Sequence, residues 1–316
     1  MLNIATCIGI FSLLQRCSAS WLPQQPLWPV ALPKPAATSN LPLIIWHGLG
    51  DNYQADGLRA LESVINETIG PTYTYFVRID EDASADRQAT FLGNLTTQVE
   101  KVCEDLASHP TLSNAPAVNA LGFSQGGQFL RAYVERCNSP KVANLVTFGG
   151  QHNGISDFQN CASDDWLCRT WTGYLKSNTW SSFVQSRLVP AQYFRDPEDL
   201  DSYLDYSNFL ADINNEREVK NSTYKENLEK LESFAMYVFA NDTTVVPKES
   251  GWFAEVNTTS TEVTKLQDRP IYKEDWLGLK SLDKDGKLHF RTIVGGHMQF
   301  GEDTIEDVAK EYFKAK

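Results

Sequence analysis

The chain lacks the usual marks of nucleic-acid-binding, membrane-spanning and zinc-binding proteins. Its 28 Lys and Arg residues are outnumbered by 40 Asp and Glu residues, which gives a net charge of −12 at pH 7. Without a surplus of basic side chains to neutralise phosphates, nucleic acid is disfavoured as a partner. No segment approaches the run of about 20 apolar residues that a stable membrane span needs. The absence of any C-x-x-C pair disfavours a zinc site, and we expect neither a metal nor an organic cofactor.

The composition is that of a globular protein of one large domain or two domains. The 316 residues are 42% hydrophobic and 22% charged, and they contain no internal repeats. This length slightly exceeds the size at which a single hydrophobic core usually stops growing. The length is therefore compatible with one large domain that carries an insertion and with a chain of two domains. We expect a monomer.

The N-terminus is typical of a protein that enters the secretory pathway. An apolar segment over residues 2–14 and small residues at 18–20 indicate a signal peptide over residues 1–20. The segment has no basic residue before its apolar part, so a buried N-terminal helix is the alternative. Residues 21–40 are rich in proline and should be extended and poorly ordered. We expect a lysosomal, vacuolar or extracellular location.

The cysteines and glycosylation sequons agree with that route. Removal of residues 1–20 leaves four cysteines, Cys103, Cys137, Cys161 and Cys168, which suggests two disulfides. Of the three possible pairings we favour Cys103 with Cys137 and Cys161 with Cys168. Acceptor sequons for N-glycosylation occur at Asn66, Asn94, Asn221, Asn241 and Asn257.

Strand and helix patterns alternate along much of the chain. Apolar or β-rich runs predict strands over residues 41–46, 72–79, 117–123, 142–150, 234–240 and 287–294. Helical spacing occurs over residues 57–65, 91–107 and 128–137, and a last helix should begin near Asp303 with Glu306 completing a capping box. The alternation predicts a mostly parallel sheet with helices on both faces, the α/β-hydrolase fold class.

The alternation lapses between residues 151 and 231, where aromatics and short helical patterns prevail. We therefore expect a hydrolase core over residues 41–150 and 233–316, interrupted by a largely helical cap over residues 151–232.

The stretch "LGFSQGG" puts Ser124 in a G-x-S-x-G motif between a predicted strand and a predicted helix. Small neighbours allow the sharp turn that exposes a nucleophilic serine at a helix N-terminus. There the Gln125 N–H can bind an oxyanion. The second donor is expected from "HGLGD", where Gly48 and Gly50 flank Leu49, and the Leu49 N–H is our candidate. Glycines in a plain turn are the neutral alternative.

A nucleophilic serine needs a base and an acid, which follow it in the order acid, then histidine. His297 follows the last predicted strand in "VGGHMQF" and is favoured as the base. Asp242 directly follows the penultimate strand and is favoured as the acid, although an Asx-turn would also use it. The other candidates fit less well, and they are His47, His109, His152, His289, Asp157, Asp164 and Asp165.

Several segments together resemble the palmitoyl-protein thioesterase family, lysosomal enzymes that remove fatty acyl groups from cysteines. The matching segments are "IIWHGLGD", "GFSQGGQFLRAYVERC", "FGGQHNGI", "FLADINNE", "ANDTTVVPKESGWF" and "LGLK", in collinear order from about residue 41 to near the C-terminus. The resemblance implies the triad Ser124, Asp242 and His297, with oxyanion amides at Leu49 and Gln125. Leu49 stands where the family carries methionine, a change that a backbone donor tolerates. The resemblance also supports both disulfides and the Asn241 sequon.

The resemblance implies hydrolysis of palmitoyl thioesters, with S-palmitoylated proteins, peptides or palmitoyl-CoA as substrates. A long apolar groove would be needed, and the cap offers aromatic residues that could line it or form its own core: Trp166, Trp171, Tyr174, Trp180, Phe183, Tyr193, Phe194, Tyr203, Tyr206 and Phe209. Two other functions stay open at this point. One is a secreted lipase or carboxylesterase that acts on oxygen esters, and the other is a lipid-binding pseudo-hydrolase without catalysis.

Overall fold

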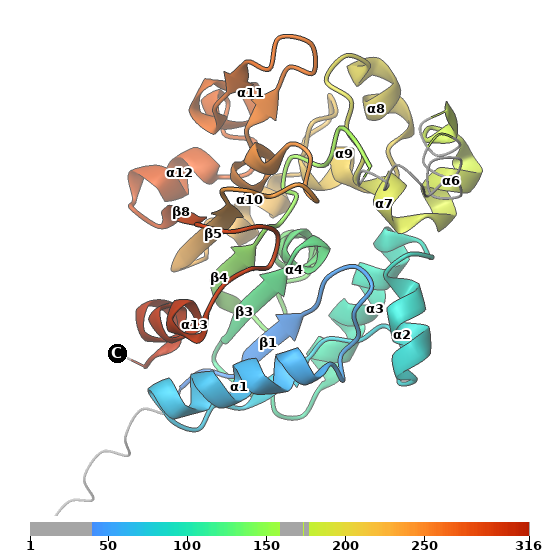
Figure 1. Ribbon diagram of the computed structural model, residues 1–316. Helices are drawn as coiled ribbons and strands as arrows, with labels where there is room; N and C mark the ends of the chain where they lie inside the picture. Colours follow the sequence, from blue (N-terminus) through green and yellow to red (C-terminus); the bar gives the residue numbers. More distant parts are fainter. Residues whose placement is uncertain (1–39, 159–172, 174–176, 316) are drawn as a thin grey trace, which may run out of the picture. The chain divides into compact units, whose positions relative to one another are not determined.

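The computed structural model describes residues 40–158, 173 and 177–315 (Figure 1). The predicted signal peptide, almost all of the proline-rich segment and the predicted Cys161–Cys168 disulfide lie outside the described residues. In the described part of the chain no helix is both long and apolar enough to cross a membrane.

A six-stranded, wholly parallel sheet forms the centre of the described part. Its strands lie in the order β2-β1-β3-β4-β5-β8. Their bounds are β1 Leu43–Trp46, β2 Thr74–Phe76, β3 Val118–Phe123, β4 Val142–Phe148, β5 Ser233–Phe239 and β8 Leu288–Ile293. All six strands match predicted runs, so the α/β-hydrolase fold class is confirmed.

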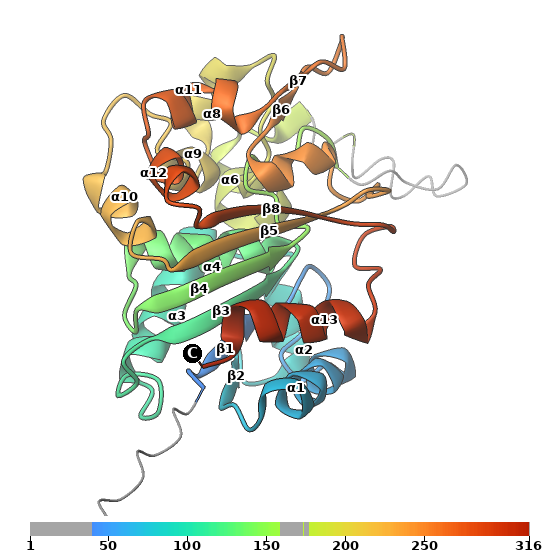
Figure 2. The same ribbon diagram turned by 90° about the vertical axis from the view of Figure 1, so that its left-hand side faces the viewer.

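Helices cover both faces of this sheet. The larger ones are α1 Asp56–Ile69, α2 Ala83–Ala89, α3 Leu95–Ser108, α4 Gln125–Arg136 and α13 Glu302–Val308, which is followed by the π-helical turn η3 Ala309–Phe313. Figure 2 shows α1 and α13 in front of the sheet, with α3 and α4 behind it. The side chains of β1 alternate between the two cores, because successive residues of a strand point to opposite faces. Leu43 and Ile45 join the core under α1 and α13, whereas Ile44 and Trp46 join the core under α3 and α4.

Two excursions leave the sheet after β4 and after β5. The first contains α6 Ser182–Arg187, α7 Val189–Gln192, α8 Leu200–Tyr206, α9 Leu210–Ile213 and α10 Ser222–Leu228. The second contains η1 Lys248–Trp252, β6 Glu255–Val256, β7 Val263–Thr264, η2 Leu266–Asp268, α11 Pro270–Lys273 and α12 Leu279–Lys284. Sequence periodicity does not resolve the second excursion, because each of its elements is too short for a repeat to emerge.

Helices α3 and α4 begin at other residues than predicted, whereas α13 begins near Asp303 as predicted but lacks the expected cap. Helix α4 begins at Gln125 rather than at residue 128. Helix α3 begins at Leu95 rather than at residue 91, because the Asn94 side chain caps it by accepting from the Thr97 N–H at 3.2 Å. Helix α13 begins at Glu302, with Gly301 at its N-cap and no side-chain cap. The predicted Asp303–Glu306 capping box is therefore wrong.

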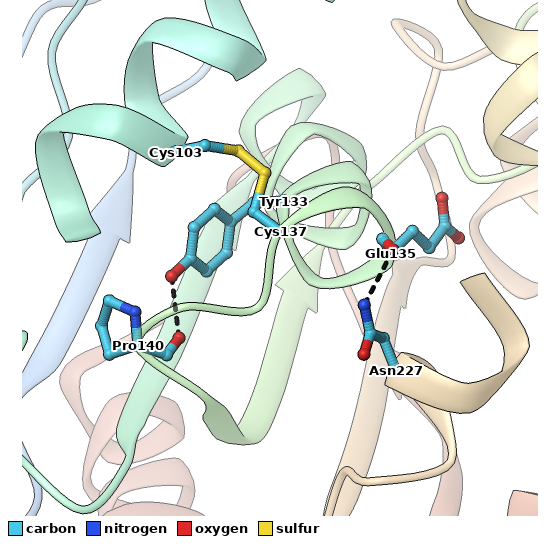
Figure 3. Close-up of a disulfide and its surroundings, with 6 residues drawn as sticks. All are labelled: Cys103, Tyr133, Glu135, Cys137, Pro140 and Asn227. Atoms are coloured by element: carbon cyan, nitrogen blue, oxygen red, sulfur yellow. Dashed lines mark hydrogen bonds between the residues drawn. A yellow bond between two sulfur atoms is a disulfide. The ribbon is translucent and has the colours of Figure 1, made fainter. Parts of the chain in front are cut away.

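A disulfide joins Cys103 of α3 to Cys137 at the end of α4, with the two Cα atoms 5.9 Å apart (Figure 3). This is the pairing favoured from the sequence. Beside it the Tyr133 hydroxyl donates to the Pro140 carbonyl at 2.7 Å. The bridge therefore ties α3 to the end of α4 on the face of the sheet that these two helices cover.

Helix α4 contains a buried ion pair, and its arginine also links α4 to the excursion after β4. Arg131 donates to Glu135 at 2.7 Å, and neither side chain is exposed. Arg131 also donates to the Ile213 carbonyl at 2.8 Å and to the Asn214 side chain at 2.8 Å. Complete burial, only partly offset by Arg131, raises the pKa of Glu135 to about 7.

This raised pKa predicts that acidification stabilises the fold relative to a Glu135→Gln variant. The folded state holds the Glu135 proton more tightly than the unfolded state, whose ordinary pKa is 4.5. Between pH 7 and pH 4.5 the wild type therefore gains stability over the variant as the pH falls, by on the order of 3 kcal/mol at most. Urea unfolding of both proteins at pH 7.5 and pH 5 measures the difference.

Glu306→Gln provides the matched control, because Glu306 makes the same i,i+4 kind of pair with Lys310 on the surface. No comparable pH-dependent difference is expected there. A Glu135→Gln difference that stays constant between the two pH values would contradict the raised pKa.

Candidate active site

The turn between β3 and α4 holds Ser124 in an unusual backbone conformation. Phe123 ends the strand, Gln125 begins the helix, and Ser124 between them has φ 52° and ψ −125°. A positive φ is uncommon for a residue other than glycine and is typical of functional turns. The Ser124 N–H donates to the Phe148 carbonyl at 2.7 Å, so the neighbouring strand β4 fixes the turn.

The glycines around Ser124 are required by close packing of backbones. A Cβ on Gly122 would lie 2.5 Å from the Gly127 Cα, and a Cβ on Gly126 would lie 2.4 Å from the carbonyl oxygens of Trp46 and His47. Contacts this short do not occur, so a side chain at either position would force α4 away from the strands. The glycines therefore let α4 start directly above β1.

Ser124, His297 and Asp242 form one continuous hydrogen-bonded set. His297 lies in the loop after β8, and its Nε2 is 3.1 Å from the Ser124 Oγ. Its Nδ1 is 2.7 Å from the Oδ2 of Asp242, which lies in the turn after β5. The Asp242 side chain is 1% exposed and that of His297 is 15% exposed. The three predicted residues thus converge from the carboxyl ends of three strands.

The surroundings of Asp242 keep its carboxylate ionised. Burial acts to raise the pKa of Asp242, but hydrogen bonds from His297 and from the N–H groups of Val245 and Thr244 outweigh it and lower the pKa. An ionised carboxylate at Nδ1 holds the proton of His297 on that nitrogen. The Nε2 atom is therefore left as the acceptor that faces Ser124.

The predicted oxyanion donors belong to two segments at the cavity, Leu49 to the loop after β1 and Gln125 to the start of α4. Neither the Leu49 N–H nor the Gln125 N–H donates to any of the residues that the structure describes. Thr90 ties their two segments together, because its hydroxyl accepts from the Gly50 N–H at 2.9 Å and its carbonyl accepts from the Gln125 side chain at 3.3 Å. Two unpaired amides near the nucleophile are what an oxyanion site requires.

His47 is occupied in a structural contact. Its Nε2 lies 3.0 Å from the Asp86 Oδ2, and its Nδ1 lies 3.1 Å from the Gly48 carbonyl oxygen. Asp86 is fully buried and also accepts from the N–H groups of Tyr53 and Ile79. Both nitrogens of His47 are thus engaged away from Ser124, which leaves His297 as the base.

The remaining candidates lie elsewhere. His152 is fully buried between Arg131 and Thr147, and its pKa lies well below the usual value because of burial and the Arg131 charge. His109 is half-buried against Tyr73 and Tyr75. His289 lies in β8 against Tyr312, and Asp157 follows the loop after β4. Asp164 and Asp165 lie outside the described residues.

A mainly apolar cavity of about 690 Å³ opens beside Ser124. Helix α1, the loops after β1, β3, β4 and β8 and the start of α7 supply its walls. Its apolar lining among the described residues is Leu49, Leu58, Leu61, Phe91, Phe123, Ile155, Phe158, Pro190, Tyr193, Met298 and Phe300.

Of the cap aromatics named from the sequence, Tyr193 is the only described one that lines this cavity, and Phe158 of the same segment lines it too. Phe194, Tyr203 and Phe209 are buried in the core, whereas Phe183 and Tyr206 are exposed. Of the two interpretations that the sequence allowed, the core is confirmed for Phe194, Tyr203 and Phe209, and Trp180 packs partly buried against that core. Trp166, Trp171 and Tyr174 lie outside the described residues. The sequence shows which aromatic residues the cap contains. It does not show that α1 forms part of the cavity wall, because that depends on how α1 packs.

Sequence analysis missed Gln151, Thr90 and Asp86, three buried side chains at the site. Gln151 donates from its Nε2 to the Ser124 Oγ at 3.0 Å. It lies three positions after the end of β4, the strand beside β3, and so on the sheet edge where β3 also ends. Its position after a predicted strand, in "FGGQ", could have indicated that Gln151 lies near Ser124, because the carboxyl ends of parallel strands share one sheet edge.

The five sequon asparagines are all at least partly accessible. Asn221, Asn241 and Asn257 are exposed, and Asn66 and Asn94 are half-buried. Among the described residues no group of three or more His, Cys, Asp or Glu side chains could hold a metal ion.

Comparison with known proteins places this site in a family. Residues 42–297 match the family described as palmitoyl protein thioesterase. Palmitoyl-protein thioesterase 1 of Caenorhabditis elegans is 36% identical over 88% of this chain and 93% of its own length. Palmitoyl-protein thioesterase 3 of Dictyostelium discoideum is 36% identical over 90% and 93%. Lysosomal thioesterase PPT2 of Homo sapiens is 28% identical over 87% and 88%. The chain belongs to the palmitoyl protein thioesterase family of hydrolases.

Proposed function

We propose that this protein hydrolyses long-chain acyl thioesters, in particular palmitoyl groups on protein or peptide cysteines, through an acyl-serine intermediate. The observation that carries the proposal is the hydrogen-bonded set of Ser124, His297 and Asp242 beside a cavity of about 690 Å³ with mostly apolar walls. The names of the relatives in C. elegans and D. discoideum support the palmitoyl substrate.

In the first half-reaction the Ser124 Oγ attacks the thioester carbonyl carbon while its proton passes to the Nε2 of His297. The carbonyl oxygen becomes an oxyanion that the Leu49 and Gln125 N–H groups stabilise. The intermediate then collapses, the C–S bond breaks, and His297 returns the proton to the departing sulfur. Because a thiol has a pKa near 8.5, its thiolate leaves with little help.

In the second half-reaction water replaces the thiol. His297 removes a proton from the water as it attacks the acyl-serine carbonyl, and the same two N–H groups receive the oxyanion. When the second intermediate collapses, the Ser124 Oγ leaves and takes the proton from His297. The products are a free fatty acid and the original serine.

The cavity suits a long aliphatic chain. Leu58 and Leu61 of α1 and Phe300 after β8 offer apolar walls beside the nucleophile. Each buried methylene stabilises the complex by about 0.8 kcal/mol. We assign the acyl-binding role to this cavity, and residues 151–232 contribute to its wall as an inserted cap through Ile155, Phe158, Pro190 and Tyr193.

A chain-length series of acyl-CoA thioesters from acetyl to palmitoyl tests the substrate. We expect kcat/KM to rise by up to about fourfold per added methylene while the chain still fits. Leu61→Trp should lower kcat/KM for palmitoyl-CoA more than for butyryl-CoA, because it shortens the cavity. Equal kcat/KM values for the acetyl and palmitoyl thioesters would contradict the proposal.

The matching oxygen esters separate a thioesterase from a lipase. Palmitoyl oxygen esters should be poorer substrates than palmitoyl thioesters, since an alkoxide is a worse leaving group than a thiolate. A clear preference for oxygen esters would favour the lipase alternative.

We also propose that the protein acts in the lumen of a lysosome or vacuole. The Cys103–Cys137 disulfide and the five accessible sequons support a secretory route. The printed name of the human relative, a lysosomal thioesterase, supports that destination.

A further inference from the structure

The buried side-chain amide of Gln151, in the loop after β4, contacts the nucleophile. Gln151 is 4% exposed and lines the cavity. Its Nε2 lies 3.0 Å from the Ser124 Oγ, as close as the His297 Nε2 at 3.1 Å. The serine hydroxyl thus has two polar side-chain partners, and only one belongs to the triad.

The direction of each hydrogen bond follows from the ionised Asp242. Its carboxylate fixes the His297 proton on Nδ1, so Nε2 can only accept. Ser124 has a single hydroxyl hydrogen and must donate it to that nitrogen. The Oγ lone pairs are then left to accept, and Gln151 must present its N–H rather than its carbonyl oxygen.

Gln128 favours that orientation of the Gln151 amide. It lies on α4 one turn after Ser124, is fully buried, and donates from its Nε2 to the Gln151 Oε1 at 3.1 Å. With its oxygen engaged by Gln128, the Gln151 amide turns its nitrogen toward the serine. Four side chains, Gln128, Gln151, Ser124 and His297, thus form a relay in which each donates to the next.

We propose that Gln151 is a further catalytic residue that donates a hydrogen bond to the Ser124 Oγ, and that Gln128 positions it. This inference rests on the proposed acyl-serine function. As His297 removes the proton during attack, negative charge develops on Oγ, and the Gln151 N–H stabilises it. During deacylation the C–Oγ bond breaks and the same N–H stabilises the departing oxygen until His297 returns the proton.

Gln151→Glu tests the direction of this bond with almost no change in shape. An ionised carboxyl at this position can only accept, so it competes with His297 for the single serine hydrogen. A protonated carboxyl can donate and can replace the amide. Gln151→Leu removes the bond at every pH, and we expect it to lower kcat/KM by about 10–100-fold, less than the roughly 10²–10³-fold loss that removal of an oxyanion donor causes.

The pH dependence distinguishes a catalytic role from a structural one. We expect the ratio of kcat/KM between Gln151→Leu and Gln151→Glu to rise at least about tenfold from pH 4.5 to pH 7.5, as the introduced carboxyl ionises. Several titratable or charged groups surround the introduced carboxyl. They are His297 after β8, His152 next in the chain with Arg131 behind it, and His47 with Asp51 in the loop after β1. The ratio of kcat/KM between the two variants cancels the effect of these groups' titration, because both variants contain the same groups.

Gln128→Leu is expected to give a smaller loss of kcat/KM that does not vary with pH, because the amide then loses its orientation but keeps its N–H. Thermal unfolding of each variant shows whether it folds, and the rate of labelling of Ser124 by a fluorophosphonate reports the attack step alone. We expect slower labelling for both Gln151 variants.

Wild-type kcat/KM and labelling rates in folded Gln151→Leu and Gln151→Glu would overturn the inference, as would a variant ratio that does not change with pH. A wild-type protein that neither hydrolyses palmitoyl-CoA nor reacts with fluorophosphonate would instead overturn the proposed function. The two failures are therefore distinguishable.

Discussion

Replacing Ser124 with alanine is expected to lower kcat for palmitoyl-CoA by about 10⁴–10⁶-fold and to abolish fluorophosphonate labelling. Alanine has no atom that can form the acyl intermediate, so only the N–H groups of Leu49 and Gln125 and the cavity would still assist water. Because the lost hydroxyl is small, binding of palmitoyl-CoA should stay close to that of the wild type. Single-turnover kinetics and equilibrium binding measure the two quantities separately.

Ser63→Ala is the matched control for this substitution, since Ser63 is exposed on α1 and its hydroxyl donates to Glu67 at 3.1 Å. It should retain wild-type turnover. A Ser124→Ala protein that folds and turns over within tenfold of the wild type would show that another residue is the nucleophile.

Replacing Asp242 with asparagine should lower kcat by about 10⁴-fold with little change in fold. The carboxylate holds the His297 proton on Nδ1 at 2.7 Å, whereas an amide can donate to that nitrogen and so favour the proton on Nε2. A protonated Nε2 cannot accept from Ser124, and the attack step loses its base. Steady-state kinetics across pH 4.5–8, with thermal unfolding as the check on folding, measure the effect.

The surface variant Asp285→Asn controls for the loss of one negative charge, because Asp285 is exposed and its nearest cation, Lys287, is 3.9 Å away. A loss of less than tenfold in Asp242→Asn would mean that the aspartate does not set the tautomer of His297.

The fold was largely predictable because its central strands are buried on both faces. A strand covered by helices on each side reads as a continuous apolar run, and β3 and β5 have no exposed position. The turn after β3 was predictable for a related reason, since only glycine fits where backbones approach within contact distance. Helix starts and the excursion after β5 were not predictable, because single capping contacts and short elements leave no periodic pattern.

The candidate triad could be proposed from order along the chain, although its contacts could not. Ser124, Asp242 and His297 each follow a predicted strand, and parallel strands bring their carboxyl ends to one edge. Gln151 satisfies the same condition but was overlooked, because glutamine carries no charge and is neither nucleophile, base nor acid in a triad. The walls of the cavity could not be predicted, because α1 supplies part of them and nothing in its local pattern indicates what its side chains will face.

What the sequence determined by itself is the identity of the chemical groups and the strand ends that carry them, because periodicity and glycine placement are local properties of a chain. What only the tertiary structure decided is which side chains touch: the 3.0 Å contact of Gln151 with Ser124, the engagement of His47 by Asp86 and the walls of the cavity. Such contacts join residues up to 173 positions apart, as Ser124 and His297 are. Their distances follow from how helices pack on the sheet, and that packing is a property of the whole fold.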